Sequence, residues 1–190
     1  MKKTLLISLM LLLLSLSSYG ETREARANKL AIGTNGIGWL NLGTANMDVG
    51  ISVHRHWSVH LSGKYNPYYW DISGHCFQNK QITASAGVRY WPWYVFSGWH
   101  YEAALQYSQY NRGGIVSQKT EEGDAYGLSL YGGYALMLNK WLNLEFGLGA
   151  WAGLTHYKTY ASPRCGKLIE KGNKFFILPN DINVSVTFTF

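Results

Sequence analysis

The residues of this sequence best suited to chemistry are its histidines. A histidine becomes a general base when a serine hydroxyl or a carboxylate lies within hydrogen-bond reach. His156 could meet Ser117 or Ser162 in this way, although nothing in their spacing requires it. No two histidines stand at a metal-ligand spacing with a carboxylate or a cysteine beside them. We therefore predict no catalytic residue, no metal site and no cofactor.

The elements that must position these residues are strands. From Lys29 onward there is no sustained helical period, and apolar residues instead alternate with polar ones in segment after segment, which is typical of strands with two unlike faces. All four prolines lie outside these segments, as expected because proline cannot donate to a β-ladder. The eight predicted strands are 29–37, 45–53, 57–66, 82–91, 99–110, 125–137, 141–157 and 182–190.

Short and long connections alternate between these strands. The shorter ones are 54–56, 92–98 and 138–140, and the longer ones are 38–43, 67–80, 111–124 and 158–180. An even number of strands with short turns at one end and long loops at the other is typical of outer-membrane barrels. The predicted fold is therefore all-β, an eight-stranded antiparallel up-and-down transmembrane β-barrel.

A soluble, lipocalin-like barrel would show the same alternation, so the composition of the two faces must decide. The polar face is mostly Gly, Ser, Thr and Asn, which fill a narrow interior, whereas a surface facing water would be rich in Lys and Glu. Bulky Leu, Phe and Val dominate the other face, and Trp and Tyr gather near strand ends as in interfacial girdles. These girdles would be Trp57, Trp91, Trp93, Tyr94, Trp99 and Trp141 at one rim and Tyr65, Tyr68, Tyr69, Trp70, Tyr107, Tyr110 and Tyr126 at the other. The apolar face should thus point outward, into lipid.

The N-terminal residues predict export. Lys2 and Lys3 precede an apolar run of about ten residues, and small residues follow it, which is the order of a secretory signal peptide. A retained anchor is the alternative, but the run is shorter than the roughly 20 residues of a membrane-spanning helix. The expected organisation is a cleaved signal peptide at 1–20, a short segment at 21–28 and a barrel domain at 29–190, located in a bacterial outer membrane.

The charge does not favour a nucleic-acid partner. The formal net charge of +6 falls to about +4 when Lys2 and Lys3 are removed, and the remaining basic residues are scattered through the connections without a clustered stripe. The expected partners are outer-membrane lipid, the barrel-insertion machinery and a surface protein.

Several motifs carry a resemblance to a known family. They are WSVHLSGKYNP at 57–67, GVRYW at 87–91, the glycine pair 113–114, and Trp141, Asn143 and Glu145. Together they resemble an uncharacterised outer-membrane barrel family of Bacteroidetes, known as a domain of unknown function, over residues 29–190. Members of that family are often encoded near fimbrial genes, which implies a link to surface appendages, and no catalytic residues are defined for them.

Alternation also predicts which charges share the interior. Arg89 and Glu102 fall on the polar faces of neighbouring strands, opposite or diagonal to one another, so we expect an interior ion pair. Asp48, Lys64 and Glu145 are candidates for the same network, because a charge in a narrow lumen loses its hydration and must be paired. Such a network would plug the barrel; a gated pore is the alternative.

Three further residues have expected structural roles. Cys76 and Cys165 fall in two long loops at the same rim, and in an exported chain two cysteines pair more often than not. We predict a disulfide between them, with two free thiols as the alternative. Phe190 ends the last alternating strand and resembles the C-terminal signal that outer-membrane barrels present to their insertion machinery.

The sequence thus predicts a non-enzymatic outer-membrane barrel whose long loops contact a surface structure, fimbrial or other, or a partner protein. One rival is a lipid-modifying enzyme. Against it, His54, His56 and His60 lie near the short-turn rim, the wrong end for outer-leaflet lipid, which leaves His75 and His156 at the other rim. The second rival is a pore for small solutes.

Overall fold

The computed structural model of the protein describes residues 29–41, 43–72, 75–113, 119–161 and 166–190. The predicted signal peptide and the segment 21–28 lie outside these residues. The described elements are β1 (Leu30–Asn35), α2 (Gly36–Leu40), β2 (Ala45–His54), β3 (Trp57–Asn66), β4 (Tyr69–Ile72), β5 (His75–Tyr90), β6 (Gly98–Gly113), β7 (Lys119–Asn139), β8 (Leu142–Ala161) and β9 (Leu168–Thr189). No helix in these ranges is both long enough and apolar enough to cross a membrane.

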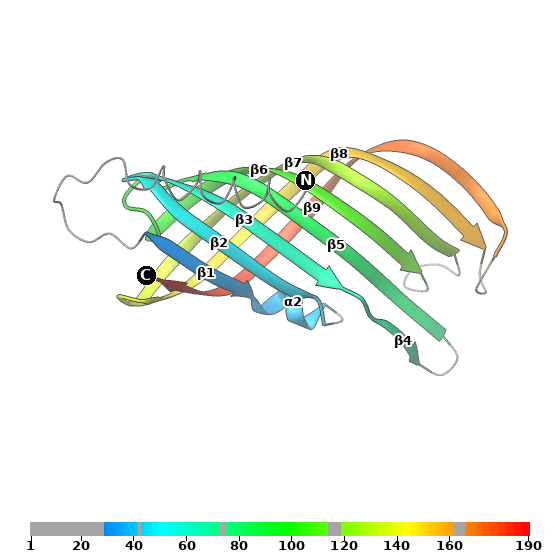
Figure 1. The fold of residues 1–190 in the computed structure, drawn as a ribbon, viewed down its shortest axis with the longest axis horizontal. Coiled ribbons are helices and arrows are strands. Elements are labelled where there is room, and N and C mark those ends of the chain that lie inside the picture. Colours follow the sequence, from blue (N-terminus) through cyan, green and yellow to red (C-terminus); the bar gives the residue numbers. More distant parts are fainter. Residues whose placement is uncertain (1–28, 42, 73–74, 114–118, 162–165) are drawn as a thin grey trace, which may run out of the picture.

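Eight of the strands close into an antiparallel ring. Strands that follow one another in the chain pair with each other, except that β3 pairs with β5 and not with β4, and the ring closes where β1 pairs with β9. The short strand β4 pairs with β5 outside this ring. Figure 1 shows the strands running obliquely around one long axis, with the ends of β7, β8 and β9 reaching well beyond β1 and β2. The all-β antiparallel prediction with eight ring strands is confirmed.

The two faces of the ring are as unlike as the alternation predicts. Apolar side chains point outward, and Leu105, Leu148 and Ile177 expose 72%, 66% and 69% of their surface. Polar side chains of the other face are buried inside the ring, as at Ser108 and Thr187. Trp151 is the exception in its strand, because it lies on the inward face and is 7% exposed.

The predicted long connections are wrong over much of their length. Range 67–80 contains β4 and the start of β5, range 111–124 contains the ends of β6 and β7, and range 158–180 contains the end of β8 and half of β9. In these extensions the regular alternation stops: Arg112 pairs with Glu121, Lys158 pairs with Lys171, and in β9 four apolar residues, 175–178, follow one another without a polar residue between them. The apolar alternation therefore disappears although the backbone ladder continues, and the sequence pattern ends before the strands do.

The seam between β1 and β9 is short, as is the pairing of β1 with β2. It runs from Ala31 to Asn35 against Ser185 to Thr189, and above it the described pairings of β9 are all with β8. Pro179 lies in this one-sided part of β9, so the expectation that all prolines lie outside strands is wrong; on an edge strand its missing N–H costs no ladder bond. The helix α2, which the sequence pattern missed, continues from β1 and lies against β9 and β2 (Figure 1).

The connection between β5 and β6, residues 91–97, folds into the end of the ring at which the short connections lie. We call this end the lower end. Trp91 and Phe96 are 0% and 3% exposed and pack with Ala31 and Ala135. Phe96 has a positive φ of 65°, and its carbonyl accepts a hydrogen bond of 2.7 Å from Asn143 Nδ2. We call this group, Trp91, Phe96, Ala31 and Ala135, the lower plug.

Among the predicted girdle aromatics whose side chains are described, which leaves out Trp70, all but two are exposed. Trp57, Trp99 and Tyr126 expose between 43% and 58% of their surface. Trp91 belongs to the lower plug, and Tyr110 points inward, where its hydroxyl contacts Thr155 Oγ1 at 2.9 Å. Each sits at the end of the alternating run, where the sequence no longer shows which face a residue occupies.

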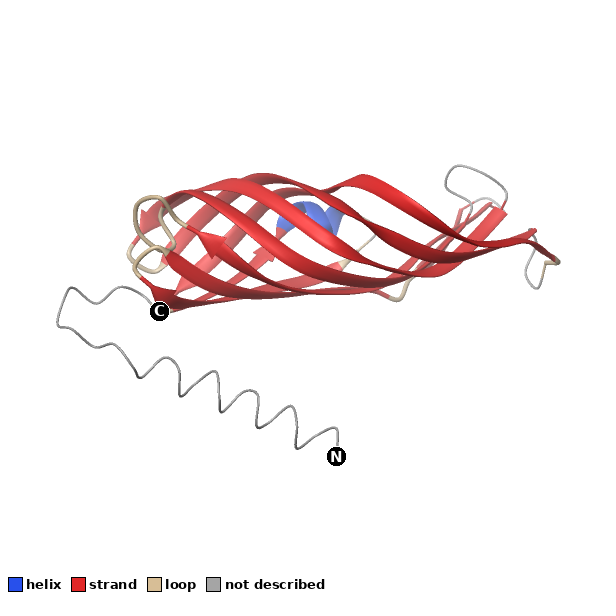
Figure 2. Ribbon diagram, turned by 90° about the horizontal axis from the view of Figure 1, so that it is seen from above, coloured by secondary structure: helices blue, strands red, loops and turns tan. Residues whose placement is uncertain are grey.

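Figure 2 shows α2 part-way along the ring, at the level where β1 ends.

The backbones of β7 and β8 approach each other closely at one pair of glycines, which leads to a testable prediction. Gly127 of β7 pairs with Gly153 of β8, and the backbone of Ala152 and Gly153 occupies the space that a Cβ at Gly127 would need. Gly127→Ala should therefore destabilise the fold by about 1–3 kcal/mol, the usual cost of overpacking. Gly63→Ala is the matched control, since nothing lies within 4 Å of a Cβ there. Urea unfolding of both variants tests this, and equal midpoints would contradict the pairing.

Candidate functional site

The centre of the ring holds an ion cluster around Arg89. Its Nε and Nη2 atoms donate to Glu102 Oε2 at 2.9 and 2.7 Å, and Nη1 donates to Glu145 Oε2 at 3.2 Å. Asp48 Oδ1 lies 3.9 Å from Nη2. Arg89 and Glu102 are direct cross-strand partners between β5 and β6, so the structure brings the two residues together as the alternation predicts.

The other predicted member, Lys64, lines the same space. It borders a cavity of about 80 Å³ that Asp48, Arg89, Glu102 and Glu145 also line. Arg89, Glu102 and Glu145 are almost entirely shielded from solvent. Three carboxylates from β2, β6 and β8 thus surround one guanidinium from β5, and charged side chains narrow the inside of the ring at this level to that small cavity. We call Arg89, Glu102, Glu145 and Asp48 the Arg89 cluster.

A serine, a histidine and an aspartate form a hydrogen-bonded chain beside this cluster. Ser58 Oγ lies 2.9 Å from His60 Nε2, and His60 Nδ1 lies 2.9 Å from Asp48 Oδ1. This order of groups is the one that activates a serine nucleophile in many hydrolases. The arrangement was not predicted from the sequence, because only the position of His60 near the short-turn rim was considered. The hairpin register, which sets Asp48 against Ser62, is the signal that could have found it.

The chain is closed to any substrate in this structure. Ser58 and His60 are 0% and 2% exposed, and Trp91 Nε1 donates to Ser58 Oγ at 2.8 Å. The serine oxygen therefore serves as the acceptor for a tryptophan of the lower plug. A nucleophile needs room for a reacting carbon near its oxygen, and here the indole occupies the adjoining space. The geometry holds Trp91 in place and joins the lower plug to the Arg89 cluster.

Above the Arg89 cluster the lumen opens into a larger cavity, which we call the vestibule. It has a volume of about 510 Å³. Its ring wall carries Lys64, Gln81, Gln106 and Arg112, together with the buried Trp151. Its other side is formed by α2 and the one-sided part of β9. The inside of the ring is thus narrow at the Arg89 cluster and wider above it.

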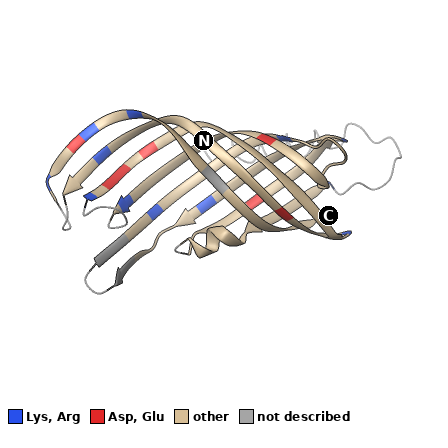
Figure 3. Cartoon of the chain, turned by 180° about the vertical axis from the view of Figure 1, so that it is seen from behind, with Lys and Arg blue, Asp and Glu red and all other residues tan. Residues whose placement is uncertain are grey.

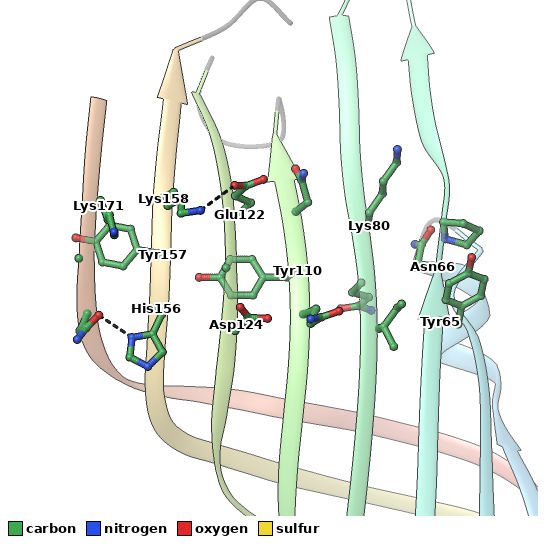
Figure 4. Close-up of a pocket in the computed structure, with 18 residues that line it drawn as sticks. Tyr65, Asn66, Lys80, Tyr110, Glu122, Asp124, His156, Tyr157, Lys158 and Lys171 are labelled. Atoms are coloured by element: carbon green, nitrogen blue, oxygen red, sulfur yellow. Dashed lines mark hydrogen bonds and ion pairs between the residues drawn. The ribbon is translucent and has the colours of Figure 1, made fainter. Parts of the chain in front are cut away.

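A second hollow lies near the long ends of the strands, where residues of both faces line it, and we call it the rim groove (Figure 4). Its volume is about 740 Å³. The ladder sets one row of its residues side by side across six strands: Tyr65, Ile82, Gln109, Asp124, His156 and Asn173. His156 Nδ1 lies 2.7 Å from Asn173 Oδ1, and Lys158 Nζ lies 3.9 Å from Glu122 Oε1. Charged residues gather along these strand extensions (Figure 3).

Tyrosines cross-link the extensions. Tyr157 donates to Glu170 Oε1 at 2.7 Å and Tyr160 donates to Glu122 Oε1 at 2.9 Å. These hydrogen bonds to carboxylates raise the pKa of both hydroxyl groups, because loss of the proton would place two negative charges together. His156 has an amide partner and a tilted contact with Tyr126, so the structure does not bring it to a described serine.

Other predicted residues fall partly or wholly outside the described part of the chain. The disulfide prediction lies outside it, since neither Cys165 nor the side chain of Cys76 is described. The same holds for Ser117, Ser162 and the side chain of His75. Phe190 is described: its N–H donates to Leu30 O at 2.8 Å, and its side chain is 64% exposed. Among the described residues, no group of three or more His, Cys, Asp or Glu side chains could hold a metal ion.

Comparison with known proteins gives a family and no relative of known activity. Residues 6–190 match the family described as Protein of unknown function (DUF3575). The chain belongs to this family. No curated protein and no solved structure matches it. The predicted membership of a domain of unknown function is confirmed, and any function must be argued from the site.

The Arg89 cluster makes a prediction about stability. Arg89→Met should destabilise the fold by about 3–5 kcal/mol, because it leaves buried carboxylates without their counter-charge. Adding Glu102→Gln and Glu145→Gln should recover much of the loss, since the neutral amides need no cation. Urea unfolding of the single and triple variants under the same conditions measures both effects. A triple variant no more stable than Arg89→Met would contradict the account.

Proposed function

We propose that the protein is a non-catalytic, eight-stranded outer-membrane β-barrel that spans the lipid bilayer with its apolar outward face. The observation that carries this proposal is the inverted distribution of polarity: a closed ring has an ion cluster inside and exposed Leu, Ile and Phe outside. Apolar surface of that extent on an isolated chain marks a membrane or protein contact. A belt that runs around the ring fits lipid better than a single partner.

The upper limit of the apolar belt supports the same orientation. Tyr107, Tyr126, Leu154 and Phe175 form one lateral row of outward residues. The next outward row is Gln109, Asp124, His156 and Asn173. The outward face therefore changes from apolar and aromatic to polar and charged within two residues on four neighbouring strands, as expected at a membrane–water interface.

The charged strand extensions would then project beyond the bilayer. Long connections face the cell exterior in outer-membrane barrels, so we assign the extensions of β6 to β9 to that side. Their charged and aromatic surface is suited to a protein partner at the cell exterior, and the family resemblance makes a fimbrial or other surface protein the first candidate. The narrow lumen argues against a pore, because the Arg89 cluster and the lower plug lie in it in succession.

The belt can be tested by a charge placed within it. Leu148→Arg puts a cation near the middle of the outward face, which should cost about 2–4 kcal/mol in a lipid-spanning barrel. Gln109→Arg is the control, because it places the same charge on the polar side of the boundary. Refolding into phosphatidylcholine vesicles followed by urea titration should separate the two variants. Equal stabilities would favour an aqueous ring and overturn the proposal.

The Ser58–His60–Asp48 chain makes an esterase the specific rival function. Under our proposal Ser58→Ala leaves the Trp91 N–H without an acceptor and lowers stability by about 1–3 kcal/mol, with no change in lipid composition. Ser62→Ala, which removes a hydroxyl whose partner is Ser85 Oγ at 2.7 Å, is the control. Mass spectrometry of membrane lipids from cells expressing each variant decides the matter, because deacylated lipid that disappears only with Ser58→Ala would establish the esterase.

A further inference from the structure

The ring wall is incomplete beside the vestibule. Asn35 ends β1, and its side chain makes the last contacts across the seam: Nδ2 donates to Ile182 O, and Oδ1 accepts from Val184 N, both at 3.3 Å. Asn46 holds the same point from β2, with its Oδ1 accepting from Asn35 N at 2.6 Å. Above these two asparagines the described backbone of β9 has a strand on one side only. A gap in the wall therefore begins at Asn35.

The vestibule lies at this gap and has two chemically different sides. Lys64 and Arg112 are the charged groups among the described residues that line it, and Lys64 also borders the smaller cavity of the Arg89 cluster below. Toward the gap the lining changes to Ile37, Leu178 and Ile182. Leu178 and Ile182 are 45% and 62% exposed, so apolar surface continues from the vestibule to the outside of the ring.

Two further observations point to a ligand. Trp151 is 7% exposed and lines the vestibule, yet its Nε1 donor has no hydrogen-bond partner in the described part of the chain. A buried donor without an acceptor costs about 1–3 kcal/mol, so such groups usually have a partner. Outside the gap, Trp39 and Leu40 of α2 expose 51% and 85% of their surface. The Trp151 N–H thus needs an acceptor inside the vestibule, and the exposed side chains of α2 can contact an apolar chain outside the gap.

We propose that the gap above Asn35 is a lateral portal, and that the vestibule binds the anionic headgroup of an outer-leaflet lipid whose acyl chains pass through the portal into the bilayer. Lys64 and Arg112 supply charge-assisted hydrogen bonds to the headgroup, and the Trp151 indole donates to it. Ile37, Leu178 and Ile182 contact the first part of the acyl chains. This inference rests on the proposed membrane location.

The rim groove is a weaker candidate for the same ligand. Its cations Lys158 and Lys171 share the groove with Glu122 and Asp124, and Lys158 already faces Glu122 at 3.9 Å. An anionic group would meet both signs of charge there. The vestibule combines cations, an unpartnered donor and an apolar exit, and the headgroup chemistry follows from that combination.

The first test measures lipid selectivity by native mass spectrometry. The full chain, refolded in dodecyl maltoside, is equilibrated with equal amounts of phosphatidylglycerol and phosphatidylcholine, and the ratio of the two lipid adducts is recorded. We expect a preference for phosphatidylglycerol that falls about tenfold or more in Lys64→Gln/Arg112→Gln. Lys158→Gln/Lys171→Gln removes two cations from the rim groove and should keep the preference. Equal loss in both double variants, or no preference in the parent chain, would overturn the proposal.

Two further measurements separate the portal from a site for soluble anions. Glycerol 3-phosphate carries the charge without the acyl chains, so it should not displace phosphatidylglycerol at equal concentration; displacement would refute the portal. Leu178→Asp should weaken adducts of both lipids, because a carboxylate at the lip repels the headgroup and disfavours the chains, and unchanged adducts would also refute it. If Lys64→Gln/Arg112→Gln fails to fold, the lipid adducts of Trp151→Phe test the vestibule in its place, because this substitution removes only the indole donor.

The test of lipid selectivity and the test of membrane insertion distinguish this inference from the proposed function. The Leu148→Arg and Gln109→Arg comparison in vesicles tests insertion without any need for the vestibule. A chain that inserts but shows no lipid selectivity would retain the membrane barrel and lose the portal. A chain that fails the insertion test would lose both.

Discussion

The ion cluster around Arg89 is the interaction on which the rest of the ring depends. Because the outward face is apolar, the polar side chains have to point inward, where water is scarce and each charge needs a partner. Glu102, Glu145 and Asp48 come from three different strands, and all reach one guanidinium only when those strands hold their observed register. A slip of one residue would turn each of them outward. The cluster therefore couples the register of β2, β5, β6 and β8.

The Ser58–His60–Asp48 chain shows why geometry alone does not make a catalyst. The two hydrogen bonds of 2.9 Å match those that activate a serine, but the serine oxygen already accepts from Trp91 and is buried. In this environment the chain links the lower plug to the Arg89 cluster through Asp48, which belongs to both. Fully satisfied polar networks of this kind give a buried interior one defined arrangement.

The ring is asymmetric along its axis, and the asymmetry comes from the short strand β1. Below Asn35 every ring strand has two neighbours, and the lumen is narrowed by the lower plug and the Arg89 cluster. Above Asn35, α2 replaces part of the wall and the lumen widens into the vestibule. Closure stabilises the lower part of the ring because a closed ladder leaves no free edge. The gap keeps an edge on β9 where Pro179 can be accommodated.

The sequence by itself determined the strand count, the antiparallel order and the Arg89–Glu102 contact, because alternation and short hairpins are local properties of the chain. The outward direction of the apolar face followed from the composition of the two faces, since small polar residues fit a narrow interior. The sequence did not determine where the strands end, since the extensions do not continue the regular alternation of apolar and polar residues. The inward positions of Trp91 and Tyr110, the hydrogen-bonded Ser58–His60–Asp48 chain and the gap beside β9 were decided only by the tertiary structure. Each depends on which strands become neighbours when the ring closes, and residues such as Asn35 and Ile182 meet across 147 positions of sequence. A local pattern contains no information about that closure.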